Sequence, residues 1–98
     1  MVYVTHKNLA DAKDMCRVLI DNKMIACANI YPIESMYKWE GEIVDEKEVV
    51  SILKTNPKKW DELKDKIEEI HPYDTPCIAK IDAEYNQEFS KWIESELS

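Results

Sequence analysis

The chain has 98 residues and a mass of 11.5 kDa, the size of one domain built around one hydrophobic core. Hydrophobic residues make up 45% and charged residues 34%, with a single glycine, which is typical of a globular chain and excludes a disordered or collagen-like one. The net charge is −7, and this disfavours binding to nucleic-acid phosphates or to anionic membranes. We therefore expect one domain over residues 1–98, with no nucleic-acid partner and no membrane partner.

The apolar runs and the cysteines indicate the compartment. No run approaches the roughly 20 apolar residues of a membrane span, and the N-terminal segment becomes polar too early for a secretory signal. Cys16, Cys27 and Cys77 contain no C-x-x-C spacing, which argues against a disulfide framework and a structural zinc site. We expect a cytoplasmic protein with reduced, mostly buried thiols.

The first half of the chain predicts a strand, a helix and then more strands. Residues 2–5 are β-branched or aromatic, and residues 9–23 show apolar positions at helical spacing behind Asn8, a good N-cap. Residues 25–31 predict a strand that Pro32 stops. Residues 35–55 alternate around the sole glycine, Gly41, and predict a long hairpin.

The second half predicts a helix, a strand and a last helix. Asn56 and Pro57 mark the start of a helix over residues 57–70, which ends ahead of Pro72. The proline-rich segment that follows predicts a stiff connector, and residues 77–82 predict a strand. Asn86 is expected to cap a short helix that reaches Leu97.

The order of these elements predicts the fold. Strand, helix, strand, strand, helix, strand and a C-terminal helix indicate an α+β ferredoxin-like sandwich, with two helices on one face of an antiparallel sheet. Two helices cannot cover the apolar residues on both faces of the hairpin, Tyr37 and Trp39 among them. We therefore expect the sheet to pack against copies of the same chain.

The segment between Pro72 and Pro76 and its flanks gather the groups best suited to chemistry. His71, Tyr73, Asp74 and Cys77 supply an imidazole, a phenol, a carboxylate and a thiol within seven residues. Imidazole and thiolate suit copper or zinc, and Asp74 could add an oxygen ligand or orient the imidazole. The spacing gives one chain only a partial ligand set, which another subunit would complete. The alternative is a helix-stop loop in which His71 caps carbonyls of the preceding helix.

Cysteine catalysis and anion binding are weaker alternatives. Cys27 lies among small apolar residues, which favours an inert buried thiol over a nucleophile served by His6 or His71. Lys54 ends the hairpin and fits either an edge lysine with a buried stem or an intersubunit ion pair or anion-binding group. Tyr37 and Trp39 fit interface anchors better than ligand-stacking rings.

Four ordered segments give the chain a specific resemblance to a known family. Nearly the whole chain resembles the CutA, or divalent-cation-tolerance, family. The segments that carry the resemblance are Ile25–Ile30, Ser35–Ile43, Lys54–Thr55 and His71–Ile78, followed by a helix from Tyr85 to Trp92.

The resemblance implies a ferredoxin-like fold, a tight homotrimer built through the long hairpin strands, and binding of divalent metal ions, Cu²⁺ above all. It nominates Cys27 and His71 as metal ligands, and Cys77 stands where the family usually has glutamate, so its thiol could serve as a soft ligand. It also implies that four residues line the cleft between subunits. These residues are Tyr37, Trp39, Lys54 and Tyr73.

The sequence therefore predicts a homotrimeric, metal-binding protein of the cation-tolerance type that is not an enzyme and needs no cofactor. The first alternative is a PII-like trimeric signalling or scaffold protein that binds a small ligand or a protein in the intersubunit cleft. The second is a small enzyme that uses Cys27 or Cys77 together with His71.

Overall fold

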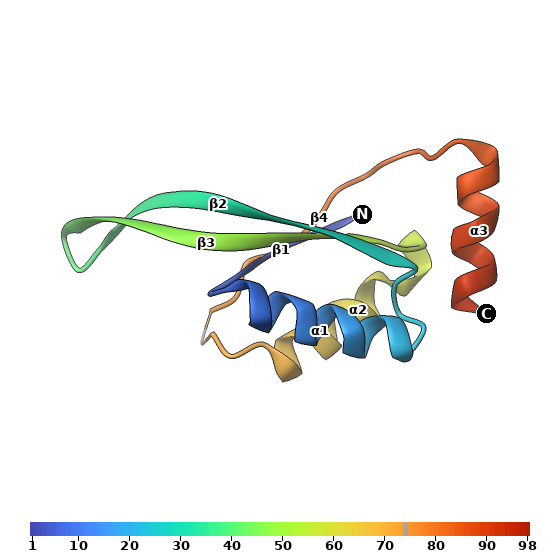
Figure 1. Ribbon diagram of the computed structural model, residues 1–98, viewed down its shortest axis with the longest axis horizontal. Helices are drawn as coiled ribbons and strands as arrows, with labels where there is room; N and C mark the ends of the chain where they lie inside the picture. The colour runs from blue at the N-terminus through green and yellow to red at the C-terminus, as the bar shows by residue number, and fades with distance from the viewer. Residues whose placement is uncertain (74) are drawn as a thin grey trace.

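The computed structural model describes residues 1–73 and 75–98. It contains one four-stranded sheet, three α-helices and one short 3₁₀ helix (Figure 1). In chain order the elements are β1 (Val2–His6), α1 (Leu9–Asp21), β2 (Cys27–Trp39), β3 (Glu42–Lys54), η1 (Pro57–Lys59), α2 (Trp60–Ile70), β4 (Ile78–Lys80) and α3 (Gln87–Leu97).

The sheet has the strand order β2-β3-β1-β4, and every neighbouring pair is antiparallel. Helices α1 and α2 lie side by side on one face of this sheet, while α3 stands at the end of the sheet opposite the hairpin turn (Figure 1). This arrangement confirms the predicted α+β ferredoxin-like sandwich with its long hairpin and appended helix.

The hydrophobic core fills the layer between the sheet and helices α1 and α2. Val2, Val4 and Leu53 from the strands meet Leu19 of α1 and Leu63 of α2, and all are buried. Cys16 belongs to this core, as its place on the apolar stripe of α1 predicted. A second cluster, with Ile93 and Leu97 of α3 as its largest buried members, fixes the C-terminal helix.

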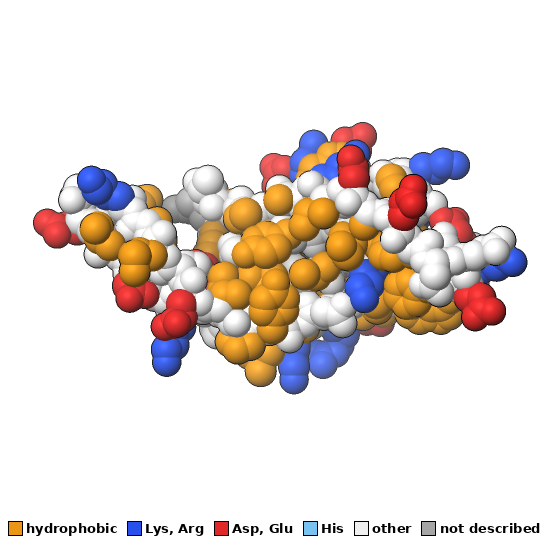
Figure 2. Space-filling view, turned by 90° about the horizontal axis from the view of Figure 1, so that it is seen from above, with side chains coloured by type: hydrophobic (Ala, Val, Ile, Leu, Met, Phe, Trp, Pro, Cys, Tyr) orange, Lys and Arg blue, Asp and Glu red, His pale blue; other side chains and the backbone are white. Residues whose placement is uncertain are grey.

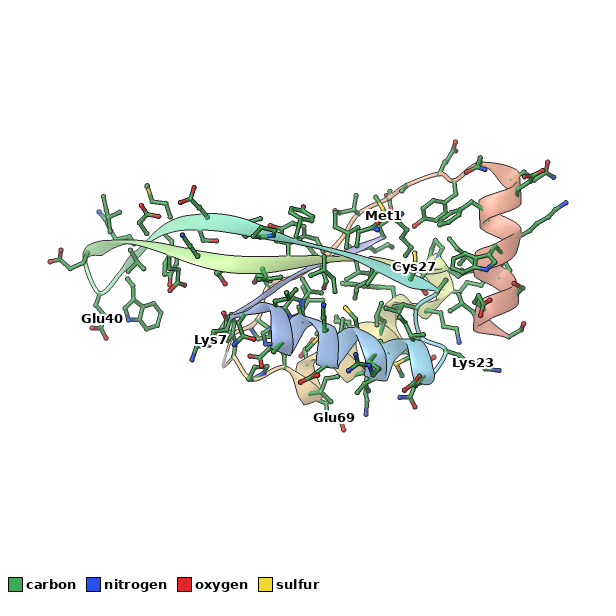
Figure 3. All side chains as sticks on the ribbon, in the orientation of Figure 1. Met1, Lys7, Lys23, Cys27, Glu40 and Glu69 are labelled. Carbon is green, nitrogen blue, oxygen red and sulfur yellow. The ribbon has the colours of Figure 1, made fainter. Side chains whose placement is uncertain are left out.

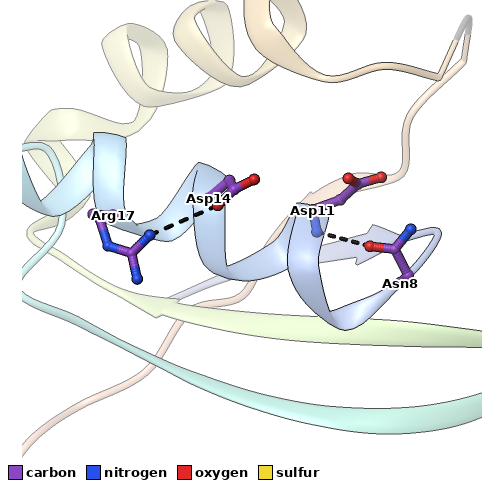
Figure 4. A network of polar contacts seen from close by, with 4 residues as sticks. All are labelled: Asn8, Asp11, Asp14 and Arg17. Atoms are coloured by element: carbon purple, nitrogen blue, oxygen red, sulfur yellow. Dashed lines mark hydrogen bonds and ion pairs between the residues drawn. The ribbon is translucent and has the colours of Figure 1, made fainter.

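Helix α1 begins where the sequence predicts. The side chain of Asn8 accepts a hydrogen bond of 2.8 Å from the backbone N–H of Asp11, so it satisfies one of the free donors of the first turn (Figure 4). One turn further on, Arg17 and Asp14 form an exposed ion pair of 3.7 Å, which contributes little to stability.

The hairpin of β2 and β3 projects far beyond the rest of the sheet. Glu40 and Gly41 form its turn, and both have positive φ, 50° and 83°, the pattern of a tight two-residue hairpin turn. Strand β1 ends at His6, which pairs with Val49. The seven residue pairs of the hairpin from there to its turn therefore have no third strand beside them, and the molecule measures 46 × 25 × 22 Å.

Pro32 does not stop the strand, so the expectation of a strand confined to residues 25–31 is wrong. Strand β2 runs through Pro32, which pairs with Val49, and continues to Trp39. The reason is that β2 is an edge strand, where a residue without an N–H need not interrupt the ladder.

Three other boundaries are shorter or more irregular than expected. Helix α1 ends at Asp21 instead of residue 23, since Lys23 adopts a positive φ of 58°. The segment predicted as one helix over residues 57–70 opens with the 3₁₀ turn η1, where Asn56 accepts from the N–H of Lys58. Strand β4 covers only Ile78–Lys80 of the expected residues 77–82.

The face of the sheet opposite α1 and α2 has no covering layer. Figure 2 looks onto this face and shows a broad hydrophobic area over its centre. The strand alternation and register place these apolar residues there: Tyr3, Tyr31, Ile33, Ile52 and Ala79, together with Val50, which is fully buried. No helix among the described residues is long and apolar enough to cross a membrane.

Candidate functional site

A cleft opens between the projecting part of the hairpin and the segment that follows Pro72. We call it the hairpin cleft. Its lining includes Tyr37 and Trp39 of β2, Val44, Glu46 and Glu48 of β3, Thr5 and Lys7 at the end of β1, and Pro72, Tyr73, Thr75 and Cys77 of the loop. Rings, carboxylates and a thiol therefore face one space.

Tyr37 and Glu46 form the first polar pair of the hairpin cleft. Tyr37 lies opposite Val44 in the register, so Glu46 is its diagonal neighbour on the same face. The phenol donates a hydrogen bond of 2.7 Å to Oε1 of Glu46. This bond raises the pKa of Tyr37, with smaller contributions from burial and from the negative charges of Glu46 and Glu48. The phenol therefore stays protonated and the carboxylate keeps a second oxygen for a ligand.

Tyr73 and Glu48 form the second polar pair, which joins the loop to the hairpin. The Tyr73 hydroxyl donates to Oε2 of Glu48 over 3.2 Å. Burial is the main cause that raises the pKa of Tyr73 to about 12, and the charge and hydrogen bond of Glu48 add to it. Tyr73 is therefore a neutral donor at any physiological pH.

His71 lies behind Tyr73 and holds it in place. Its Nδ1 accepts a hydrogen bond of 3.1 Å from the backbone N–H of Tyr73, and its Nε2 lies 2.7 Å from the carbonyl oxygen of Thr5. Because a carbonyl can only accept, the network assigns the proton to Nε2 and leaves Nδ1 as the acceptor. Both ring nitrogens are thus occupied. The His71 ring therefore does not cap the carbonyls of α2, as the alternative interpretation expected. The backbone N–H of His71 does so instead, by donating to the carbonyl oxygen of Ile67.

His6 stands beside His71 in the interior. The two rings are stacked with centroids 5.6 Å apart, and only 1% of His6 is exposed. Nε2 of His6 lies 2.7 Å from Oγ of Ser51, while its buried Nδ1 has no hydrogen-bond partner within residues 1–73 and 75–98. Burial, reinforced by His71, lowers the pKa of His6 to about 4, so the ring is neutral near pH 7.

Cys27 and Lys54 lie at the other end of the sheet. They are opposite each other in the register, and the Lys54 ammonium lies 5.2 Å from the centre of the Phe89 ring of α3. Thr5, the carbonyl partner of His71, pairs with Val50, which is four residues from Lys54 and hence about 13 Å along the sheet. Figure 3 shows the separation, with Cys27 near α3 and Lys7 of the hairpin cleft farther from α3, near the start of α1 and on the side of the projecting hairpin.

One protomer therefore brings together only part of the predicted site. Tyr37, Trp39, Tyr73 and Cys77 gather in the hairpin cleft, whereas Cys27, His71 and Lys54 do not line it. Among the described residues no three His, Cys, Asp or Glu side chains are placed to hold a metal ion within the chain. Asp74 lies outside the described residues. The exposed thiol of Cys77 departs from the expectation of mostly buried thiols.

Sequence reasoning missed the two carboxylates of the hairpin cleft. Glu46 and Glu48 are the acceptors of its two phenols. A signal for them was present, since a two-residue turn at Glu40 and Gly41 fixes the whole hairpin register and places Glu46 diagonally across from Tyr37.

Comparison with known proteins identifies the family. The family model described as CutA1 divalent ion tolerance protein matches residues 1–96. The chain belongs to the CutA family. The CutA divalent-cation tolerance protein of Thermococcus kodakarensis is 46% identical over 94 residues, which cover 95% of this chain and 90% of the relative. CutA is a non-enzymatic family, so the rival interpretation as a small cysteine enzyme is set aside.

Two solved CutA structures share the fold throughout. CutA1 from Pyrococcus horikoshii superposes with a TM-score of 0.95 at 42% identity, covering 99% of this chain and 96% of that one. The periplasmic divalent cation tolerance protein CutA from Archaeoglobus fulgidus gives a TM-score of 0.94 at 37% identity, again covering 99% and 96%. The long hairpin and the helices on one face are therefore features of CutA proteins.

Proposed function

We propose that the protein is a cytoplasmic homotrimer that binds a divalent cation, Cu²⁺ above all, between its subunits and serves cation tolerance. The observation that supports this most is the hairpin cleft, which holds two carboxylates and a thiol, although among the described residues these groups are not placed to hold one ion together within a single chain. Binding between copies would supply what one copy lacks. The names of the relatives, divalent-cation tolerance proteins, favour the same class of ligand.

Self-association is supported by surface that the protomer leaves open. The hairpin beyond Val49 is a two-stranded ribbon, and such ribbons are marginally stable in water without a further strand or a packed face. The uncovered sheet face carries Tyr31 and Ile52 among its apolar residues, and large exposed apolar areas mark interfaces. Packing copies of the chain around these surfaces satisfies both requirements at once.

The proposed metal ligands differ in how accessible they are to a metal ion. Cys77 is exposed in the hairpin cleft and needs no rearrangement. Cys27 is half-buried at the far end of the sheet, away from the hairpin cleft. It could therefore bind the same metal ion as Cys77 only if the two thiols came from different copies of the chain. His71 could bind a metal only after giving up the Tyr73 N–H or the Thr5 carbonyl.

Titration of the purified protein with Cu²⁺ and with Zn²⁺, which is not redox-active, tests the proposal. We expect Cys77→Ser to weaken binding of either ion at least tenfold, because it removes the accessible thiolate. Cys16→Ala is the matched control, since that thiol is buried in the core and faces away from the hairpin cleft. Binding no tighter than that of an unrelated acidic protein would contradict the metal proposal.

The second candidate is a trimeric, PII-like sensor that binds a small organic ligand. The specific observation in its favour is that three aromatic side chains, Tyr37, Trp39 and Tyr73, line the same cleft, and ligand sites are typically lined by apolar and aromatic groups with a few polar ones. A thermal shift screen separates the two candidates, because a metal-binding protein should respond to metal ions alone.

The proposed cytoplasmic localisation differs from the compartment given for one relative. The Archaeoglobus fulgidus protein is described as periplasmic. Fractionation of the source cells, followed by detection of the native protein with an antibody, decides between the two compartments. Recovery with periplasmic or extracellular markers would contradict our expectation.

A further inference from the structure

The hairpin cleft combines aromatic walls with unneutralised carboxylates, and this is the chemistry that recognises positively charged amines. We propose that the hairpin cleft binds an alkylammonium ion, a small organic cation held by ring faces and carboxylates. The inference names a ligand class for the second candidate function. It rests on that proposal because it takes the hairpin cleft as the ligand site.

The rings supply the first half of the argument. In the single protomer Trp39 is 65% exposed and Tyr37 is 41% exposed, and both large side chains line the cleft. Tyr73 lines the same cleft as Tyr37, and the two phenols donate to Glu48 and Glu46, which are two residues apart on β3. The face of an aromatic ring attracts a cation within about 6 Å of its centre, and tryptophan does so most strongly. Methylated ammonium groups fit such rings because their charge is spread over apolar methyls.

The carboxylates supply the second half. Glu46 and Glu48 each accept a phenol hydroxyl, and neither takes part in an ion pair within the described ranges 1–73 and 75–98. Lys7 is the single basic residue in the described lining, so the cleft carries an excess of negative charge. A neutral or anionic guest of the same shape would therefore lose the electrostatic attraction that a cation gains.

The donor set suits an organic cation better than a bare metal ion. The described residues offer no three metal-ligating side chains that converge within the chain. One oxygen of Glu46 and one of Glu48 already accept a hydrogen bond from a phenol hydroxyl, and the two phenols stay protonated. An alkylammonium ion needs no inner-sphere ligands, because its charge is stabilised by ring faces and by carboxylates at van der Waals distance.

The loop side of the hairpin cleft is preorganised. Tyr73 is fixed at its backbone by Nδ1 of His71 and at its hydroxyl by Glu48, and its ring lies 4.8 Å from the imidazole. A ring that is held before the ligand arrives loses little conformational entropy on binding. Tyr73 is therefore a fixed part of the lining that it shares with the 65% exposed Trp39.

Isothermal titration calorimetry with choline chloride, which replaces sodium chloride at constant ionic strength, tests the inference. The matched neutral probe is 3,3-dimethylbutan-1-ol, in which carbon takes the place of the charged nitrogen. We expect saturable choline binding and at least tenfold weaker binding of the neutral alcohol. Trp39→Leu and Glu48→Gln should each weaken choline binding about threefold to tenfold.

Two control substitutions lie outside the hairpin cleft. Trp92→Leu removes a partly exposed tryptophan of α3, and Glu62→Gln removes an exposed carboxylate of α2. Both should leave choline binding unchanged. Glu48→Gln keeps an oxygen to accept from Tyr73, so it tests the charge even if Trp39→Leu disturbs assembly.

Equal binding of choline and its neutral analogue, no saturable choline binding, or full binding by Glu48→Gln would each overturn the inference. The result is separable from the metal proposal. Choline binding without Cu²⁺ or Zn²⁺ binding would defeat the metal proposal alone, and metal binding without choline binding would defeat this inference alone.

Discussion

The rings of His6 and His71 are stacked with their centres 5.6 Å apart and an angle of 16° between their planes, and this stacked pair joins the core to the hairpin cleft. His6 contacts Ser51 of strand β3, and His71 holds the backbone of Tyr73. The chain has no other histidines. Both are therefore built into one structural unit, so neither stands free as an exposed ligand.

This stack makes stability depend on pH. The pKa of His6 falls from 6.5 to about 4, because burial disfavours the imidazolium and His71 adds to the effect. Between these pH values the unfolded chain binds a proton that the folded chain does not bind. The contribution of the neutral His6 to the free energy of unfolding should therefore be complete above pH 6.5. It should be lost as the pH drops toward 4, and the loss should be at most about 3 kcal/mol.

Urea denaturation between pH 4 and 8, in buffer with a chelator, measures this dependence. His6→Gln removes the titrating ring and keeps a polar group near Ser51. The variant should be less stable at pH 7 but show a flatter pH profile than the parent protein. An unchanged profile would mean that His6 does not carry the dependence.

The buried layer under the sheet should dominate the stability of the protomer. Leu63 of α2 is fully buried against the sheet and α1. Leu63→Ala should lower the free energy of unfolding by about 2–5 kcal/mol, because it removes buried methyl groups and leaves a cavity. Leu9, which is 50% exposed, is the matched control, and Leu9→Ala should change stability by less than about 1 kcal/mol. Similar losses for both variants would contradict the assigned core.

The hairpin turn should be sensitive to the loss of its glycine. Gly41 has a φ of 83°, and no atom lies within 4 Å of where a Cβ would stand. Gly41→Ala therefore meets no clash, and its cost is the backbone strain of a positive φ, about 1 kcal/mol. Glu40 also has a positive φ, so Glu40→Asn should stabilise the turn slightly. Thermal melts should show the two variants shifting in opposite directions.

The link from Tyr73 to Glu48 should matter more for the hairpin cleft than for folding. Tyr73→Phe removes the hydrogen bond of 3.2 Å and leaves the ring in place. We expect a loss of about 0.5–1.5 kcal/mol in stability, the usual value for a partly buried hydrogen bond. Amide hydrogen exchange should become faster in the loop around Tyr73 and stay unchanged in α1. Uniform exchange rates would show that the bond does not fix the loop.

The sequence carried most of the information about the fold. Helical spacing behind Asn8, alternation around Gly41 and the order of elements sufficed to predict the sandwich and the long hairpin. The error at Pro32 arose because edge position is a property of the whole sheet. Only the finished strand order shows that β2 lies at an edge, where proline is tolerated.

The site was harder to predict, because it depends on which end of the sheet each residue reaches. The structure places Tyr37 and Trp39 in the hairpin cleft of one protomer, whereas Cys27 and His71 were grouped by their chemistry alone. The register separates these two residues, since Cys27 pairs with Lys54 while His71 bonds the strand at Thr5. Contacts between the His71 ring and β1 are non-local, and no spacing in the sequence reveals them.

The most direct test of the account is the molar mass in dilute solution, measured by size-exclusion chromatography with multi-angle light scattering. The open hairpin and the uncovered sheet face predict an assembly of copies, and the proposed trimer has three times the protomer mass of 11.5 kDa and should be stable on dilution to the micromolar range. A particle with the mass of a single chain, folded and persistent at that concentration, would contradict the central claim that these surfaces are covered by copies of the same protein.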